Sequence, residues 1–361
     1  MSKLDQPKYI ASLDRSQMLE SIKEINLQCQ QVWNDWRGQT RINMPAHYRK
    51  SSNIVLNGMG GSALAAHVVQ SLYRDSLKTP FEFIHGYSLP KIVGRNTLYI
   101  IASYSGDTEE PIATFNEARR RQADIFIITK GGKLATLARR HGVPAYIFEE
   151  KHNPCQQPRM GVGYNLTSLF ALLNRLGIIR VTEKDFQIAK SALERGQKLF
   201  SLEKPIKSNL AKKIAQKLHG AFPVIIASEH LEGSAHIFAN QINENGKNFS
   251  LYQFIPELNH HLLEGLEHPR LPRRLAKFLF LESSLYHPHN QKRHTITKKI
   301  VRSHGLEALS YQAWGRQPIE QVFEILSFGS YVGFYLAILN RIDPSPIPWV
   351  DYFKAELKKR H

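Results

Sequence analysis

The chain has 361 residues, 42% of them hydrophobic, so it can bury a sizeable core and form about two domains. Its two cysteines, Cys29 and Cys155, lie far apart and outside any CxxC motif, which argues against a disulfide framework and a cysteine zinc site. The start MSKLDQPKYI lacks an apolar signal core, and no apolar run approaches the roughly 18 residues that span a bilayer. We therefore expect a cytoplasmic protein with no membrane partner.

The charge balance is strongly basic, with 48 Lys and Arg against 31 Asp and Glu, a formal net charge of +17. Such a balance is typical of proteins that bind nucleic acid. Here the basic residues are spread along the chain, and no helix-turn-helix, zinc finger or aromatic RNA-binding motif occurs. We expect no nucleic-acid partner, and a positive field would also steer phosphorylated substrates.

The first third of the chain predicts a helix followed by a parallel sheet. Apolar residues recur at spacings of three and four over residues 16–37, which predicts an amphipathic helix packed on the first domain. Apolar strands are then predicted at 53–57, 81–84, 98–102, 124–129 and 144–149, with helical segments between most of them. This alternation is typical of a doubly wound α/β domain, in which ligands bind at the carboxyl ends of the strands.

A glycine-rich turn, GMGGSA, follows the first of these strands and opens a helix that runs to Leu72. Gly60 and Gly61 let the backbone approach a ligand, and the helix start presents unpaired N–H groups to an anion. Ser62 adds a hydroxyl group. A tight turn with an N-cap is the simpler interpretation. The turn also fits a loose dinucleotide fingerprint, with Glu82 where a ribose-binding acid would lie.

A second turn, SYSGDTEE, follows the strand 98–102 and precedes another helix. It carries three hydroxyl side chains, Ser103, Ser105 and Thr108. Hydroxyl groups at this density suit a compact phosphate monoester better than a pyrophosphate, which backbone groups normally hold. The two turns converge on one ligand only if their strands are neighbours in one parallel sheet.

The segment 151–160 has two prolines and no periodicity, so its composition favours a linker. It leads into a predicted helix at 163–176, and Arg159, just before that helix, could project its guanidinium into a cleft and stabilise an enolate-like oxygen. Further elements then repeat the alternation less cleanly, which predicts a division into residues 1–152 and 153–361. These are helices at 183–200, 206–218, 231–245, 319–339 and 349–358, and strands at 224–227, 276–281 and 307–310.

The second half carries candidate catalytic groups. Glu244 lies at a predicted helix end, beside Gly246, and His260 lies in the segment PELNHH. Alone, such a carboxylate is usually solvated and such a histidine usually structural. Beside two phosphate-type turns, they supply what an aldose-ketose isomerase needs: one group moves a proton between adjacent carbons, and the other handles ring-oxygen protons.

The GMGGSA and SYSGDTEE turns resemble the signature pair of sugar isomerase (SIS) domains, specifically those of bifunctional phosphoglucose/phosphomannose isomerases. The similarity extends over residues 50–358 and includes the segments NENGK and PELNH. It implies two SIS domains, each doubly wound and flavodoxin-like. It further implies Glu244 as the base, Arg159 as the enediolate stabiliser, and His260 and Lys354 in ring opening. The phosphate ligands that it implies are Gly60, Gly61, Ser62, Ser103, Ser105 and Thr108.

The resemblance implies interconversion of glucose 6-phosphate and fructose 6-phosphate, and also action on mannose 6-phosphate, through a cis-enediol. It implies no metal and no other cofactor, and a homodimer in which the histidine reaches into the partner's site. Two residues depart from the family pattern: Asp107 where Asn is more usual, and Ser330 where an acidic residue is often found.

Two other functions stay open from the sequence. A non-catalytic sugar-phosphate-binding SIS module would keep Ser103, Ser105 and Thr108 but would need neither Glu244 nor His260. A dinucleotide-dependent oxidoreductase would bind its cofactor at the first turn. Within the isomerase hypothesis, Glu257 and Glu264 are the next carboxylates to consider as the base.

Overall fold

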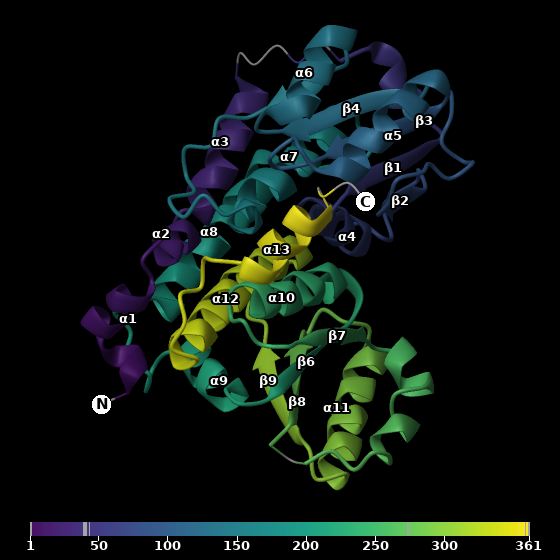
Figure 1. The fold of residues 1–361 in the computed structure, drawn as a ribbon. Helices are drawn as coiled ribbons and strands as arrows, with labels where there is room; N and C mark the ends of the chain where they lie inside the picture. Colours follow the sequence, from purple (N-terminus) through teal and green to yellow (C-terminus); the bar gives the residue numbers. More distant parts are fainter. Residues whose placement is uncertain (1, 39–41, 43, 273, 358, 360–361) are drawn as a thin grey trace.

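The computed structural model describes residues 2–38, 42, 44–272, 274–357 and 359. It has a parallel sheet toward each end and a layer of helices between them (Figure 1). The five-stranded sheet has the order β2-β1-β3-β4-β5 and the four-stranded sheet the order β7-β6-β8-β9. The prediction of a doubly wound α/β fold with parallel sheets is confirmed.

The strands of the first sheet are β1 (Asn53–Gly58), β2 (Phe81–Ile84), β3 (Thr97–Ala102), β4 (Asp124–Thr129) and β5 (Ala145–Ile147). Those of the second sheet are β6 (Phe222–Ala227), β7 (Leu251–Phe254), β8 (Ala276–Glu282) and β9 (Glu307–Gln312). Every neighbouring pair is parallel. The carboxyl ends of the strands in each sheet therefore share one edge.

The strands of the first sheet are apolar on both faces because helices cover both. Along β1, Ile54 and Leu56 join the core shared with the central helices, whereas Val55 packs with the outer helices. These outer helices are α5 (Glu109–Arg120) and α6 (Gly132–His141). In the second sheet, α11 (Pro288–Ser303) covers the outer face in the same way.

One continuous core joins the two sheets through the central helices. These are α3 (Ile25–Arg37), α4 (Gly61–Leu72), α7 (Val162–Arg175), α8 (Glu183–Phe200), α9 (Leu210–Leu218), α10 (Glu232–Glu244) and α12 (Pro318–Leu339). By length and composition alone, α12 could cross a membrane, but 94% of its most apolar window is buried inside the protein. It is the central core helix, packed against α8, α9 and α10.

The structure differs from the sequence-based expectations in four elements. The helix predicted at 16–37 is two helices, α2 (Met18–Lys23) and α3, because the chain bends at Glu24 so that α2 packs on α12 while α3 packs on α7. Three further elements were not predicted from the sequence: α1 (Pro7–Leu13), β7 and α11. β7 is a four-residue edge strand, and α11 buries only His294, Thr297 and Val301, so neither has a strong apolar pattern.

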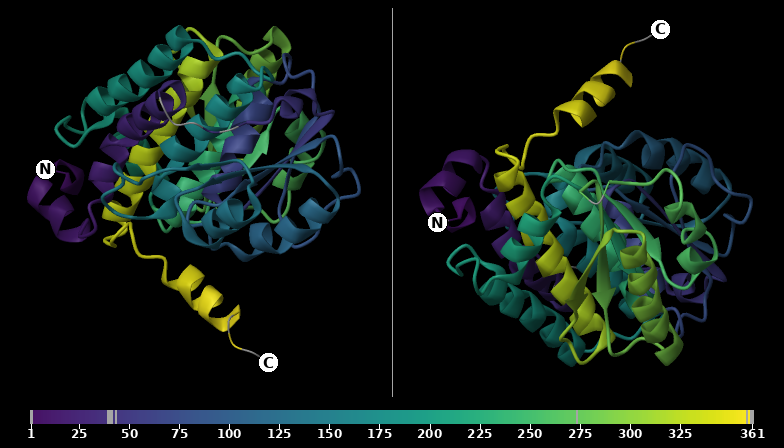
Figure 2. Two further views of the ribbon diagram at one scale, coloured as in Figure 1. Left: turned by 90° about the horizontal axis from the view of Figure 1, so that it is seen from above. Right: turned by 90° about the horizontal axis from the view of Figure 1, so that it is seen from below.

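The segment 151–160 is not a flexible linker, contrary to the expectation from its composition. The Asn153 side chain is buried and donates to Glu150 Oε1 (2.7 Å), and the Cys155 backbone N–H donates to Ser21 Oγ (2.9 Å). These bonds hold the segment against the body. By contrast, α13 (Pro348–Leu357) stands away from the body, and none of its residues is buried (Figure 2).

Candidate active site

The two turns predicted to hold phosphate lie in contact. β1 and β3 are neighbours, with Gly58 paired to Ala102 at the carboxyl edge of the sheet. The Tyr104 backbone N–H donates to Ser62 Oγ (3.2 Å), so a hydrogen bond joins the turns directly. The expectation that both turns meet at one edge of a parallel sheet is confirmed.

The first turn presents backbone to open space. Gly60 adopts φ +49° and ψ −129°, which L side chains rarely adopt, and nothing lies within 4 Å of the position that its Cβ would occupy. Gly61 then begins α4, so the start of the helix lies beside that space. The next two N–H groups already donate within the turn, from Ser62 to Met59 O (3.2 Å) and from Ala63 to Gly60 O (3.0 Å). Ser62 is only 6% exposed, and its hydroxyl accepts the bond that joins the two turns.

The second turn is organised by its own hydroxyl groups. Ser103 Oγ lies 2.7 Å from Thr108 Oγ1 and accepts a hydrogen bond from the Gly106 backbone N–H (3.1 Å). Ser105 Oγ accepts from the Asp107 N–H (3.2 Å). Ser103 is buried, whereas Ser105 and Thr108 are half-buried. Each hydroxyl therefore has a fixed direction before any ligand binds.

Both departures from the family pattern have structural partners. The Asp107 carboxylate accepts a hydrogen bond from the backbone N–H of Lys133 (3.0 Å) at the start of α6, where a negative charge is stabilised. The Ser330 hydroxyl donates to Leu326 O (2.8 Å) and accepts from Gln241 Nε2 (2.8 Å). Asp107 thus caps a helix, and Ser330 joins α12 to α10.

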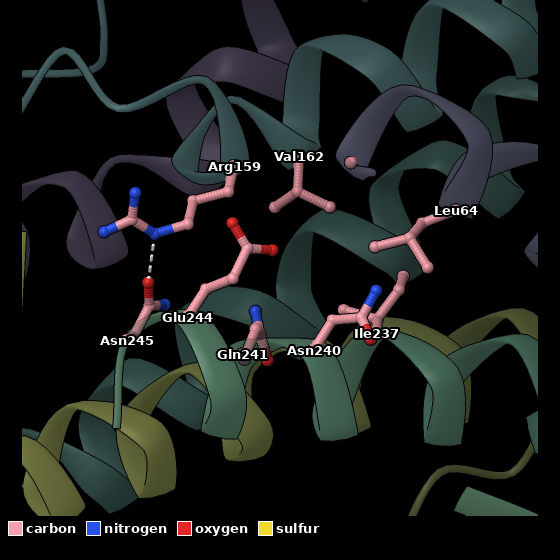
Figure 3. A pocket seen from close by; sticks show the side chains of 9 residues that line it. Leu64, Arg159, Val162, Ile237, Asn240, Gln241, Glu244 and Asn245 are labelled. Atoms are coloured by element: carbon pink, nitrogen blue, oxygen red, sulfur yellow. Dashed lines mark hydrogen bonds between the residues drawn. The ribbon is translucent and has the colours of Figure 1, made fainter. Parts of the chain in front are cut away.

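Glu244 and Gly61 line the same pocket (Figure 3). Glu244 is the last residue of α10, whereas Gly61 is the first of α4. The structure therefore brings the predicted base to the glycine-rich turn after β1. The remaining lining residues are Leu64, Arg159, Val162, Ile237, Asn240, Gln241 and Asn245.

The pKa of Glu244 is raised above its usual value because the side chain is shielded from water. The positive charges of Arg159, Lys247 and Lys354 act in the opposite direction. A shielded carboxylate with a raised pKa, beside cations, suits a group that accepts and returns a proton near neutral pH.

Arg159 lies in the short 3-10 helix Pro158–Met160, immediately before α7. Its guanidinium donates to Asn245 Oδ1 (2.6 Å), Gln157 Oε1 (2.8 Å), Pro344 O (3.0 Å) and Ser345 O (2.7 Å). These four bonds leave one of the five N–H groups without a partner among the described residues. The Arg159 side chain is therefore held in a fixed orientation beside Glu244 before any substrate arrives.

Within the segment NENGK, the sequence predicts a role only for the glutamate. In the structure, fully buried Asn245 orients Arg159. Lys247 Nζ donates to the carbonyl oxygens of Glu244 and Pro344, and burial lowers the pKa of Lys247 to about 8. Asn245 and Lys247 follow Glu244 closely in the sequence, and this clustering of polar residues was the signal that could have indicated their roles.

The other two predicted catalytic residues lie outside this pocket. His260 ends the 3-10 helix Glu257–His260, is exposed, and its side chain makes no hydrogen bond within the described part of the chain. Lys354 is exposed on α13, close enough for its charge to lower the pKa of Glu244. The structure of one chain thus brings Glu244 and Arg159 together, with Lys354 nearby and His260 elsewhere.

The residues that the structure describes give little support to a dinucleotide site or a metal site. Glu82 pairs with Val55 inside β2 and does not lie at the carboxyl edge, where a ribose would bind. Among the residues that the structure describes, no group of three or more His, Cys, Asp or Glu side chains is arranged to hold a metal ion.

Comparison with known families matches both halves of the chain. Residues 47–175 match the SIS domain, and residues 207–357 match the bacterial phospho-glucose isomerase C-terminal SIS domain. Similar solved structures include a putative phosphosugar isomerase from Clostridium difficile (TM-score 0.70, 14% identity, 95% of this chain and 99% of that one). Another is a glucose-6-phosphate isomerase like protein from Thermus thermophilus (TM-score 0.61, 16% identity, 96% and 99%). At these identities the likeness concerns the fold alone.

Relatives with higher identity extend over most of the chain. The bifunctional phosphoglucose/phosphomannose isomerase of Caldicellulosiruptor bescii is 29% identical over 94% of this chain and 98% of its own length. Proteins of the same name from Aquifex aeolicus and Thermoplasma acidophilum are 30% and 31% identical, over 85% and 86% of this chain and 90% and 89% of their own lengths. The chain therefore belongs to the bifunctional phosphoglucose/phosphomannose isomerase family.

Proposed function

We propose that this protein is an isomerase that interconverts glucose 6-phosphate and fructose 6-phosphate, and also acts on mannose 6-phosphate. The observation that carries the proposal is the shared pocket of Glu244, Arg159 and the start of α4. A sugar-phosphate sensor would need the turns alone, and a shielded carboxylate beside an oriented guanidinium would serve no purpose in it. The homologous proteins of the same family support the substrates.

In the mechanism that we infer, the substrate is bound as an open chain by its phosphate. The N–H groups at the starts of α4 and α5, together with Ser62, Ser103, Ser105 and Thr108, surround the phosphate. We place C1 and C2 within reach of Glu244, which lines the same pocket as Gly61 at the start of α4. The phosphate thus supplies binding energy that orients the carbons at the base.

Glu244 then transfers the proton. Its carboxylate removes the proton from C2 of the aldose, the C–H electrons form the C1–C2 double bond, and the C1 carbonyl oxygen becomes the enediol oxygen. Arg159 stabilises the negative charge that develops on the oxygens. Return of the proton to C1, with transfer of the O2 proton to O1, gives the ketose. No atom is gained or lost, so the reaction runs in both directions.

We further propose a homodimer in which His260 acts in the partner's site, with Lys354 assisting ring opening. His260 is exposed and outside its own chain's pocket. The α13 helix also exposes an apolar surface that is unusual for a monomer: Trp349 (81%), Tyr352 (60%), Phe353 (60%) and Leu357 (52%). Burial of that surface by a second copy would stabilise a two-fold dimer.

Turnover of glucose 6-phosphate, mannose 6-phosphate and fructose 6-phosphate by the purified protein tests the reaction. We expect glucose 6-phosphate and mannose 6-phosphate each to yield fructose 6-phosphate, without added metal. Binding of the three sugars without any turnover would instead identify a sensor. Both cysteines are free, which fits a reducing compartment, and we assign the reaction to the cytoplasm.

The shared site is tested by mixing two inactive variants, Glu244→Gln and His260→Ala, after light scattering has established the dimer mass. If His260 acts in the partner's site, each mixed dimer regains one intact site. Random mixing then restores roughly a quarter of wild-type activity. If both groups act within one chain, mixing restores nothing. A fully active monomer would also refute the dimer.

A further inference from the structure

The pocket is a wedge between two antiparallel helices, α4 and α10. At the narrow end, the Gly233 N–H donates to Ser71 Oγ (3.2 Å), and a Cβ on Gly233 would lie 2.6 Å from the Val68 backbone. At the wide end, Gly61 and Glu244 face the same space. The helices thus touch at one end and separate toward the candidate catalytic residues.

Three polar residues of α10 follow one another at intervals of four along this wedge: His236, Asn240 and Glu244. Residues four apart lie on the same face of a helix. His236 Nδ1 lies 3.0 Å from Nδ1 of His67 on α4, so this pair joins the helices between their crossing and the pocket. Asn240 lies between that pair and the base, and it lines the pocket (Figure 3).

Asn240 differs from its neighbouring amides in having no assigned structural role. Gln241 donates to Ser330 Oγ, Asn243 bonds to Ala239 O and Ser250 O, and Asn245 accepts from Arg159. Within the described part of the chain, the Asn240 side chain makes no hydrogen bond. It is half-buried, so its amide keeps a donor and an acceptor ready in a partly desolvated place.

We propose that Asn240 is a specificity-determining residue that binds the hydroxyl group at C3 or C4 of the open sugar chain. The proposal rests on the proposed isomerase function. Under that function, the oxygens on C1 and C2 belong to Glu244 and Arg159, the C5 oxygen closes the ring, and C6 carries the phosphate. The hydroxyls at C3 and C4 are the ones left for a neutral amide.

The rest of the pocket wall supports this assignment. Leu64, Val162 and Ile237 also line the wedge, and none of them can pair with a hydroxyl. A sugar hydroxyl held there without Asn240 would lose its hydrogen bonds to water and gain none. The Cβ atoms of residues four apart are about 5–6 Å from one another, so a six-carbon chain at Glu244 can also reach Asn240.

Asn240→Ala, assayed with glucose 6-phosphate and its 3-deoxy and 4-deoxy analogues, tests the proposal. We expect kcat/KM for glucose 6-phosphate to fall about 5- to 100-fold, the range for one lost hydrogen bond in a desolvated site. In the wild type, one of the two analogues should show a similar fall. That analogue should lose nothing further in the variant, because the pair has already been broken.

Because C3 and C4 are unchanged by the reaction, the variant should lose the same factor with mannose 6-phosphate. Asn243→Ala, on the same helix but bonded within the chain, should keep wild-type kcat/KM for all substrates. Competitive inhibition by inorganic phosphate should be unchanged in Asn240→Ala, which shows that the phosphate turns are intact. If Asn240→Ala does not fold, Asn240→Leu, which keeps the volume, takes its place.

Equal losses for glucose 6-phosphate and both deoxy analogues would overturn the proposal, because a structural role would produce that result. Unchanged kcat/KM for glucose 6-phosphate would overturn it too. Failure of the proposed function is a separate outcome. If the wild type binds glucose 6-phosphate without isomerising it, dissociation constants from calorimetry replace kcat/KM, and the same comparison of the three ligands decides the role of Asn240.

Discussion

The turns after β1 and β6 have the same topology and different contents. Each follows a buried strand and leads to a helix of the central layer. The first turn has Gly60 beside open space. In the second, Ser228 Oγ donates to Ile255 O (2.8 Å), and Glu229 Oε1 accepts from the His287 N–H (2.8 Å). The two turns thus share one architecture, but in the second turn side chains of the turn itself bond to other parts of the chain.

In the second half of the chain, the proposed catalytic residue lies at the end of helix α10 and not at its start. Because α4 and α10 run antiparallel, the start of α4 lies across the pocket from the end of α10, where Glu244 is located. A carboxylate at a helix C-terminus is opposed by the helix dipole. Here Arg159 and Lys247 offset that effect. The helix start that we propose to bind phosphate and the helix end that we propose to transfer the proton thus line one pocket.

The largest expected effect is a difference in turnover between variants at the two ends of α10. Glu244→Gln keeps the shape and removes the proton acceptor, so turnover should fall by about 10²- to 10⁴-fold with little change in substrate affinity. Glu232→Gln makes the same change at the other end of the helix, where the carboxylate accepts from the Glu229 N–H. It should leave turnover close to wild type. Steady-state kinetics of both variants check this contrast.

Loss of the oriented guanidinium should have the next largest effect. Arg159→Gln should lower kcat by about 10²- to 10³-fold, the range for a lost oxyanion donor. It should also change the pH profile. Glu244 acts when ionised, so activity is lost as pH falls through its pKa; removing the positive charge raises that pKa further. The acid limb should therefore move to higher pH.

The exposed Arg120 on α5 provides the matched control for that experiment. Arg120→Gln removes one positive charge as well, but far from the pocket lining. Its kcat and acid limb should match those of the wild type. If the two variants shifted the acid limb equally, net charge would explain the shift, and the pairing of Arg159 with Glu244 would not.

Replacing a serine in the turn after β3 and replacing one in the turn after β6 should have different effects on substrate binding. Ser105→Ala should weaken substrate binding by about 1–3 kcal/mol, as expected for a lost hydrogen bond to a charged group. Ser228→Ala should leave binding unchanged and lower the free energy of unfolding by about 1–3 kcal/mol, because its buried partners are left unpaired. Calorimetric titration and urea unfolding measure the two quantities. Weakened binding in Ser228→Ala would show that the second turn also contacts the ligand.

The smallest effect concerns the acidic residue of the second phosphate turn. Asp107→Asn should change phosphate affinity by less than about threefold, because Asp and Asn cap a helix almost equally well and the carboxylate is bonded to the Lys133 N–H. Inhibition by inorganic phosphate measures this affinity. A much tighter phosphate complex in Asp107→Asn would show that the charge at this position repels the ligand.

The sequence predicted the parts of the site that follow from local pattern. Gly60 and Ser105 lie in turns whose composition suits a phosphate, and the rule for parallel sheets brings those turns to one edge. Glu244 was identified beside a helix-ending glycine and by its motif. Each of these signals lies within a few neighbouring residues.

Other parts could not be predicted because they depend on distant contacts. Arg159 is oriented partly by the carbonyls of Pro344 and Ser345, and a backbone carbonyl has no sequence signature. Asp107 finds its partner on the next helix of the sheet. The composition of the segment 151–160 predicts a linker, whereas one of the bonds that hold the segment in place comes from Ser21, far along the chain.

Proton exchange with solvent tests the central claim most directly, that Glu244 transfers a proton between C1 and C2 of a sugar phosphate. Fructose 6-phosphate is incubated with the protein in D2O and followed by proton NMR. We expect the wild type to incorporate solvent deuterium at C1 of the ketose and C2 of the aldose. Glu244→Gln should incorporate deuterium about 10²- to 10⁴-fold more slowly while binding inorganic phosphate with unchanged affinity. Near-wild-type incorporation by Glu244→Gln would contradict the account.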